Sequence, residues 1–493
     1  MTRESFATAL KMGAVAFLLV VFLFADGVWG SSPGFIGSAL REIAAVFRDP
    51  GTQWMVFLCL GIYFTAFLFL CSRGAHVFWR AANPSLWLAC ALLIGAVLYA
   101  IDYSPSMQAL ILLGGAALGQ GIAVWASPEA RSRKPGVRNS FGVLVVSLLV
   151  ILLALASVWQ TSASRIFEYH GQARWSGPWN NPNIYGLLMG VGIVLTVGQF
   201  VQSLTSNVQS QKAEGRSWKL GARKYAVVIL FLFAASLMAR GLLRSYSRGA
   251  WVAAVCGLAY LFWSGVQSPP VLRSSSATEG GRSNIQSRWI YWLKKNWLPF
   301  SVILASAFAL SFWQFQHAEH ENMVARRAFS VGNANDFSWR NRLSSWEGAL
   351  QIMAEHPWLG VGWNQPELLY DHYYLPPKVD ESAAIGLNDY LTVGATLGVP
   401  ALICFGMYIW LSLTRKSGAR SQEPEVRDRQ DACPTLDFGP WTVDSLQATC
   451  RAGAIVLIVG FWFDGGLFGL PTAATFWILL GLGAVELHKG TAK

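Results

Sequence analysis

The run Phe141–Trp159, FGVLVVSLLVILLALASVW, decides the fold class, because none of its side chains is charged. A helix of about 20 apolar residues crosses a hydrocarbon core of about 30 Å. Comparable runs recur along the chain from residue 12 to residue 485. The sequence therefore predicts an all-α polytopic membrane protein rather than a string of soluble domains.

The composition agrees with this class of protein. Of the 493 residues, 53% are hydrophobic and 13% are charged, whereas a soluble domain carries about 25% charged residues. The net charge of +11 would indicate nucleic-acid binding in a soluble protein. Here the basic residues lie in short loops between apolar runs, where they set topology, so we expect no nucleic-acid partner.

We expect about 12 transmembrane helices, which make residues 1–493 a single transmembrane domain. The first span is retained rather than cleaved, because no convincing small-residue cleavage site follows it. The eleventh span is short and can extend back through Leu446–Cys450 if Arg451 snorkels. The expected spans are Met12–Phe24, Trp54–Cys71, Leu86–Ile101, Met107–Trp125, Phe141–Trp159, Ile184–Val201, Tyr225–Ala239, Ala250–Gly265, Trp297–Phe315, Gly394–Leu413, Ala452–Phe463 and Leu467–Val485.

The distribution of Lys and Arg predicts the topology. One set of alternate loops holds 22 of them, and the positive-inside rule places that side, with both termini, in the cytoplasm. The polar insert 316–393, between the ninth and tenth spans, then faces outward as a large loop with short helices. It contains five basic and ten acidic residues, so we expect its arginines to act locally.

Cysteine, histidine and carboxylate positions predict no metal and no cofactor. The seven cysteines lie in or beside apolar runs or in a loop predicted to be cytoplasmic, and no CxxC motif occurs. Neither a disulfide framework nor a zinc site is therefore expected. No clustered set of His or carboxylate ligands is visible in the sequence either.

Three arginines, Arg240, Arg244 and Arg248, depart from the topology rule, because they crowd the outer end of the seventh and eighth spans. Charges at that depth are costly unless they are paired or used. They either snorkel to lipid phosphate or clamp an anionic head group. Arg340 and Arg342 begin the expected helix of the insert and could reach the same anion, or could solvate the helix end.

Two helix amino termini are predicted at the same outer side. Asn181 can cap span six, with Pro182 in the first turn, and Ser247 can cap span eight. Free N–H groups at such termini favour anions. Together with Arg244 and Arg248 they suit a pyrophosphate better than a neutral solute, although ordinary capping alone would explain Asn181 and Ser247.

Within the insert, apolar residues at three- and four-residue steps predict a short helix that lies against the membrane surface or the bundle. Pro357 ends this helix, and Gly360 and Gly362 permit a sharp turn. The aromatic residues of the insert either form an interfacial belt or stack on sugar rings. The apolar stripe comprises Leu343, Trp346, Leu350 and Met353, and the aromatic residues are Trp339, Trp358, Trp363, Tyr370, Tyr373 and Tyr374.

Taken in order, these motifs resemble the O-antigen ligase and polymerase family of bacterial membrane glycosyltransferases. The resemblance covers about residues 175–400. Its motifs are Asn181-Pro182-Asn183, the SRGAW of Ser247–Trp251, Arg340 and Arg342 before Trp346, the HPWLGVG of His356–Gly362, and the NDYL of Asn388–Leu391 with Gly398 after it.

The resemblance implies transfer of a glycan from a polyprenyl (undecaprenyl) pyrophosphate to a hydroxyl of a glycolipid or glycan acceptor. The reaction would take place among membrane lipids at the periplasmic face of the bacterial inner membrane. Arginines can replace a metal ion in stabilising the leaving pyrophosphate. The implied pyrophosphate ligands are Arg244, Arg248, Arg340 and Arg342; Asn181, Asn183, Trp363 and Asn364 would bind substrate, and Asn388 and Asp389 would position or activate the acceptor.

One position departs from the family. A histidine held to be essential precedes the NDYL segment in the family, and here that position is Leu387, which cannot accept a proton. The nearby candidates for a substitute base are His372, Asp371, Glu381 and Asp389, of which His372 is the best by its ordinary pKa. This departure leaves open a divergent or non-catalytic relative.

Three alternatives remain open. A polymerase of the same architecture would differ only in its acceptor. A transporter or flippase should place ionisable or broken-helix features at mid-span, and the predicted spans are nearly free of charge. A relative that only binds the glycolipid would show no turnover.

Overall fold

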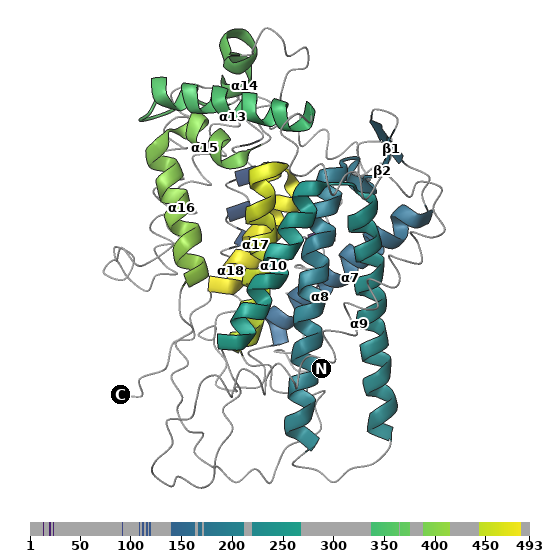
Figure 1. Ribbon diagram of the computed structural model, residues 1–493. Coiled ribbons are helices and arrows are strands. Elements are labelled where there is room, and N and C mark those ends of the chain that lie inside the picture. The colour runs from purple at the N-terminus through teal and green to yellow at the C-terminus, as the bar shows by residue number, and fades with distance from the viewer. Residues whose placement is uncertain are drawn as a thin grey trace, which may run out of the picture.

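The computed structural model describes residues 140–162, 166–169, 172–211, 219–267, 337–363, 365–374, 388–414 and 443–484, with scattered helical residues between 13 and 119. Most of these residues are helical. At the centre of the bundle (Figure 1), α8 (Pro182–Gln211), α10 (Arg248–Gln267) and α17 (Val443–Phe463) pack against one another, and α9 (Lys219–Arg244) packs on α8. The predicted helical membrane-protein class is thereby supported.

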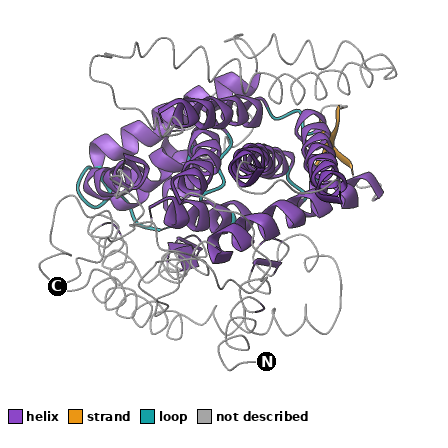
Figure 2. Cartoon of the chain, turned by 90° about the horizontal axis from the view of Figure 1, so that it is seen from below, coloured by secondary structure: helices purple, strands orange, loops and turns teal. Residues whose placement is uncertain are grey.

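The remaining long helices surround this centre. The helix α7 (Ser140–Ser162) packs on α8 and α9, and α18 (Leu470–Ala484) packs on α17, while α16 (Val399–Thr414) stands beside α18. Figure 2 shows the same bundle from below, along the helices. The core between the helices is mainly aliphatic and aromatic, with buried residues such as Leu188 and Phe461.

Three helical segments in the described part of the chain are long and apolar enough to cross a membrane: Gly142–Gln160, Pro182–Val201 and Leu446–Phe463. They coincide with the predicted fifth, sixth and eleventh spans, and the extension of the eleventh back to Leu446 is confirmed. The helices α16 and α18 are apolar but shorter. The total of about 12 spans stays a prediction, because the first four predicted spans and the ninth lie wholly or mostly outside the described residues.

A small cap lies across one end of the bundle. In Figure 1, α13 (Phe337–Glu355) runs roughly at right angles to the long helices, with α14 (Gln365–Leu369) above it. The π-helical turn η3 (Tyr370–Tyr374) follows α14, and α15 (Asp389–Leu397) connects the cap to α16. The predicted helix in the insert is therefore confirmed.

The predicted apolar stripe of α13 is only half right. Leu343 and Leu350 are 49% and 53% exposed, whereas Ala349 and Ile352 are buried against α15. Trp346 and Met353 pack at the edge of this contact. The buried face of α13 is therefore offset from the predicted stripe, and Met353 packs against Gly394 of α15.

The prediction of the tenth span as one helix, Gly394–Leu413, is wrong. The segment breaks at Gly398, whose φ is +86°, between α15 and α16. The backbone after α13 docks onto this break: Val399 N donates to Pro357 O at 2.8 Å, and Gly362 N donates to Thr396 O at 3.0 Å. The apolar pattern runs through the break without interruption, and the local signal for it is Gly398 followed by Pro400 in the first turn of α16.

This docking gives the HPWLGVG motif a structural role. A Cβ on Gly398 would lie 2.6 Å from the carbonyl carbon of Trp358, and one on Gly360, whose φ is +65°, would lie 2.5 Å from Ala395 O. Both glycines therefore allow two backbones to touch. Protein backbone fills the gap left by the broken helix. In transporters, by contrast, the unwound helix segments line a cavity.

We expect Gly398→Ala to destabilise the protein by more than about 2 kcal/mol, because the conformation of Gly398, with φ +86° and ψ 166°, alone costs a non-glycine residue about 1–3 kcal/mol, and the new Cβ also meets the backbone. Gly406→Ala in α16 is the matched control, because nothing lies within 4 Å of its added Cβ. Thermal unfolding of both purified variants measures the difference. Equal melting temperatures for the two variants would show that the break needs no glycine.

One further element was not predicted. The strands β1 (Ile166–Tyr169) and β2 (Gln172–Trp175) form an antiparallel hairpin, with Ile166 opposite Trp175. The short helix η1 (Gly177–Trp179) leads from it to the start of α8. The hairpin lies at the same end of the bundle as the cap (Figure 1).

Candidate functional site

The turn between α9 and α10 is tight and strained. It consists of Ser245, Tyr246 and Ser247, and the buried Tyr246 has a φ of +52°. A non-glycine residue in this region costs free energy, and such residues concentrate at functional sites. Ser247 Oγ accepts a hydrogen bond from Ala250 N at 3.2 Å, which confirms the predicted cap of α10. Arg248 follows directly and is buried.

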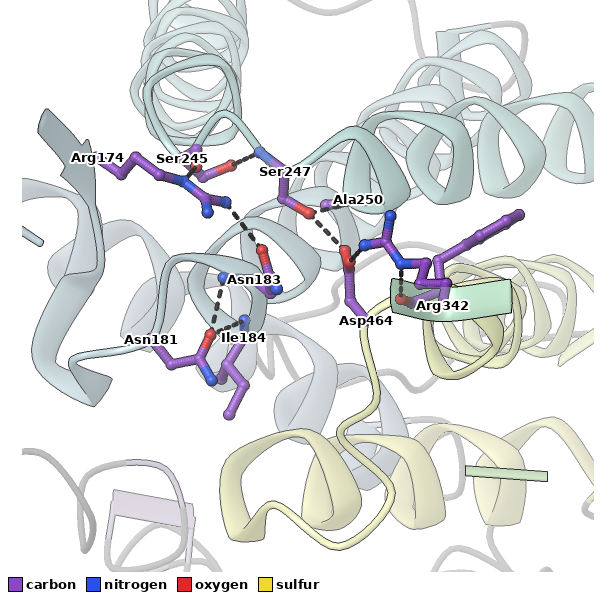
Figure 3. A network of polar contacts seen from close by, with 10 residues as sticks. Arg174, Asn181, Asn183, Ile184, Ser245, Ser247, Ala250, Arg342 and Asp464 are labelled. Carbon is purple, nitrogen blue, oxygen red and sulfur yellow. Dashed lines mark hydrogen bonds and ion pairs between the residues drawn. The ribbon is translucent and has the colours of Figure 1, made fainter. Parts of the chain in front are cut away.

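Asp464 connects this turn to the cap. Its Oδ2 accepts a hydrogen bond from Ser247 Oγ at 2.5 Å, and its Oδ1 pairs with Arg342 Nη2 at 2.8 Å. Arg342 Nε also donates to the carbonyl of Phe463 at 2.8 Å. Figure 3 shows the Asp464 carboxylate lying between Ser247 and Arg342. Two segments that are distant in the sequence thus meet at one carboxylate.

The close approach of Asp464 depends on Gly249. A Cβ at this position would lie 2.5 Å from Asp464 Oδ2 and 2.9 Å from Phe463 Cβ. The carboxylate therefore sits against the first turn of α10, where helix N–H groups favour negative charge. In this structure Asp464 faces the helix terminus at which the sequence analysis expected a substrate anion.

On the other side of the turn lies Arg174, which the sequence analysis did not identify. This buried side chain donates from Nε to Ser245 O and from Nη2 to Asn183 Oδ1, each at 2.8 Å. Asn181 Oδ1 accepts from Asn183 N at 2.9 Å and Ile184 N at 3.3 Å, which confirms the predicted cap of α8. Asn183 therefore holds Arg174 in place (Figure 3). The hairpin contains no recognisable sequence motif. The sequence feature that could have identified Arg174 is its position on the predicted outer side of the membrane, where the topology prediction expects few basic residues.

Arg240 also contacts the hairpin, because its guanidinium carbon lies 5.2 Å from the centroid of the Trp175 ring. Arg244, the last residue of α9, is partly exposed. Arg340 is exposed on α13, two residues before Arg342, and no contact described here joins it to Asp464. We call the following five residues the arginine cluster: Arg174, Arg240, Arg244, Arg248 and Arg342.

Asn388 and Asp389, predicted to serve the acceptor, are both buried inside the scaffold. Asn388 Oδ1 caps α15, accepting from Tyr390 N and Leu391 N at 3.1 Å each. Asp389 Oδ2 accepts from Leu467 N at 2.6 Å. Asp389 thereby anchors residues 464–469, the loop that begins with Asp464.

The environment of Asp389 predicts a pH-dependent stability. Burial raises the pKa of Asp389 to about 8, and the N–H groups of Leu467 and Gly466 only partly oppose this. Since the folded state holds the proton more tightly than the unfolded state, stability should fall as the pH rises from about 4 to about 8. Melting temperatures of wild type and Asp389→Asn between pH 5 and 9 measure this, and the variant should show a flatter profile. Identical profiles would contradict the assignment.

The remaining predicted residues are dispersed. Trp363 is 2% exposed and belongs to the hydrophobic core, and Asn364 lies outside the described residues. His372 is exposed in η3 beside Tyr373, their ring centroids 6.4 Å apart. No described contact joins His372 to the arginine cluster. Leu387 and Glu381 lie outside the described residues, as does the side chain of Asp371.

The aromatic residues of the insert separate into two groups. Trp363 and Tyr370 are core residues, whereas Trp358 and Tyr373 are 76% and 78% exposed. Trp339 packs against Phe463, beside the Arg342–Asp464 pair. Within the described part of the chain no three His, Cys, Asp or Glu side chains lie together in a group that could hold a metal ion.

Comparison with known proteins bears on this same region. The search of individually curated proteins found no match. A family model described as O-antigen ligase matches residues 233–406, a stretch that contains Arg240, Arg244, Arg248, Arg342 and the HPWLGVG and NDYL motifs. This match over residues 233–406 supports the resemblance to the O-antigen ligase family.

Proposed function

We propose that the protein transfers a glycan from a polyprenyl pyrophosphate donor to an acceptor hydroxyl at the periplasmic face of the bacterial inner membrane. The observation that carries this proposal is that Arg342 and Ser247, the residue directly before Arg248, both contact Asp464. A pyrophosphate needs several donors on different sides, and the arginine cluster supplies guanidinium groups from β2, α9, α10 and α13.

In the proposed reaction the acceptor oxygen attacks the anomeric carbon of the glycan. The bond from that carbon to the pyrophosphate oxygen breaks, and the pyrophosphate leaves with the electron pair. The guanidinium groups of Arg248 and Arg342 stabilise the charge that develops on the leaving group, a kind of stabilisation that is often a large part of catalysis. Arg244 and Arg340 lie on the same side and supply further positive charge.

Asp464 has a positioning role in this scheme. It fixes the Arg342 guanidinium by one ion pair, and the Phe463 carbonyl fixes it by a second contact. A guanidinium held in advance needs little reorganisation when the charge develops. In this proposal Asn181, Asn183 and Arg174 form the opposite side of the site, while Asn388 and Asp389 act through the scaffold.

The acceptor proton requires a base. Asp389 is engaged with the backbone N–H of Leu467, so we keep His372 as the candidate; an approach of η3 to the cluster would be required. A His372→Ala protein with full activity would remove it from this role.

The position of the cap supports the proposed location. Two helices of the insert, α13 and α14, lie at the same end of the bundle as the β1–β2 hairpin (Figure 1), and the positive-inside rule puts the insert outside. The insert would then be periplasmic and both termini cytoplasmic. The acceptor is a glycolipid if the protein is a ligase; in the alternative, a polymerase of the same architecture, it is a growing glycan.

Deletion of the gene tests the function. The deletion strain should accumulate polyprenyl-linked glycan and lose the corresponding surface polysaccharide. Wild-type protein should restore the normal pattern, and an Arg248→Ala protein expressed at the same level should not, because a missing donor to the leaving group costs about a hundredfold or more. Lipid-linked intermediates and surface glycans that are unchanged in the deletion strain would contradict the proposal.

A further inference from the structure

A row of aromatic rings runs beside the Arg342–Asp464 pair. Trp339 and Trp346 meet edge to face at 5.9 Å between ring centroids, and Trp346 and Trp462 do so at 5.7 Å. Tyr390 continues the row, 5.9 Å from Trp462. Edge-to-face and offset arrangements of this kind are the favourable ones for aromatic pairs, so the row holds its members in defined orientations.

Trp462 is the exposed member of this row. It is 42% exposed although Trp346 and Tyr390 flank it. Tyr390 is itself fixed, because its hydroxyl donates to Ile458 O at 2.7 Å. The protein therefore presents an indole ring that is held by its neighbours but not covered by them.

Phe463 contacts both the row of aromatic rings and the Arg342 guanidinium. Trp339 packs on Phe463, with 6.5 Å between the ring centroids, and Arg342 donates to the carbonyl of Phe463. Asp464, the ion-pair partner of Arg342, follows two residues after Trp462. An open aromatic surface thus lies next to a guanidinium group that can meet a phosphate.

We propose that Trp462, supported by Trp346 and Tyr390, forms a saccharide-binding subsite for the sugar attached to the donor diphosphate. The inference rests on the proposed function. A sugar ring carries hydroxyls at its edge and C–H groups on its faces, and the C–H faces pack well on an indole. In a glycosyl diphosphate this sugar is directly bonded to the charged group, so its binding surface must adjoin the cation site.

A buried donor in the row fits the same ligand. Trp346 Nε1 is buried and finds no hydrogen-bond acceptor among the described residues. Leaving such a group unsatisfied is unfavourable. A sugar hydroxyl that enters beside Trp462 could accept the hydrogen bond from Trp346 Nε1 after a small shift of the Trp462 ring. An apolar lipid chain could not.

An interfacial belt tryptophan is the competing explanation for Trp462, since tryptophan favours that depth. The two explanations differ in their dependence on the sugar. A belt residue contributes equally whether or not the lipid diphosphate carries a saccharide. A saccharide subsite contributes only when the saccharide is present.

Binding measured in lipid nanodiscs separates them, with undecaprenyl pyrophosphate and undecaprenyl pyrophosphate N-acetylglucosamine as the two probes. Trp462→Leu should weaken binding of the sugar-bearing probe by roughly three- to tenfold and leave the sugar-free probe unchanged. Trp462→Phe should lose less. The control Trp410→Leu removes a tryptophan that is 63% exposed on α16, and it should change neither affinity.

Other outcomes overturn the inference in distinguishable ways. If Trp462→Leu weakens both probes equally, or weakens neither, the ring contacts no sugar. If wild-type protein binds the two probes with equal affinity, there is no saccharide subsite. If it binds neither probe, the proposed function fails, and the subsite fails with it.

Discussion

An Arg342→Ala protein should transfer glycan about a hundred- to a thousandfold more slowly than the wild type, the usual loss when one donor to a developing negative charge is removed. Arg342 is held by both Asp464 and the Phe463 carbonyl, so a neighbouring side chain cannot easily replace it. Initial rates in proteoliposomes, with a polyprenyl-linked glycan as donor, measure the effect.

Arg340 provides the comparison for this variant. It lies on the same helix but is exposed, and no described contact joins it to Asp464. Arg340→Ala should therefore reduce the rate by less than about tenfold, as expected for a surface charge that contributes mainly through its field. Equal losses for Arg340→Ala and Arg342→Ala would contradict the role given to the ion pair.

The second large effect is expected for Asp464→Ala. Removing one partner of a buried ion pair costs about 3–5 kcal/mol, and we expect about 2–3 kcal/mol here because the Arg342 side chain is 13% exposed. The variant should also lose activity by about a hundredfold, since Arg342 and Ser247 both lose their common partner. Melting temperature and transfer rate are both measured.

A double-mutant cycle with Arg342→Ala tests the coupling. Once Arg342 is absent, the further replacement of Asp464 should cost little stability and little activity. Fully additive losses in the double variant would show that the two residues act independently, in conflict with the geometry.

Local features of this site could be predicted from the sequence, because they depend on neighbours in the chain. The caps at Asn181 and Ser247 follow from residue type and from the apolar runs behind them, and both are present. The start of span eleven before Ala452 follows from the same reasoning. The helix of the insert and its end near Pro357 also obey local rules.

Contacts between distant segments could not be predicted in this way. The Arg342–Asp464 pair joins residues 122 positions apart, and an aspartate after an apolar run gives no indication of its partner. Arg174 enters from a hairpin that has no motif. Gly398 and Pro400 mark the helix break locally, but the docking of residues 357–362 onto that break is a contact between distant segments.

The sequence analysis assigned chemical roles to several motifs, and in the structure these motifs fall into two groups. Ser247 and Arg342 both contact Asp464. Asn388, Asp389 and the glycines of HPWLGVG instead hold helices and loops in place. The presence of a motif therefore does not separate residues that contact substrate from residues that position the scaffold.

A cryo-EM structure of the protein with a bound polyprenyl pyrophosphate glycan tests the central claim most directly. The account predicts density for the diphosphate within hydrogen-bonding distance of both Arg248 and Arg342, at the end of the bundle where α8 and α10 begin. A diphosphate bound elsewhere, or touching only one of these two arginines, would contradict it.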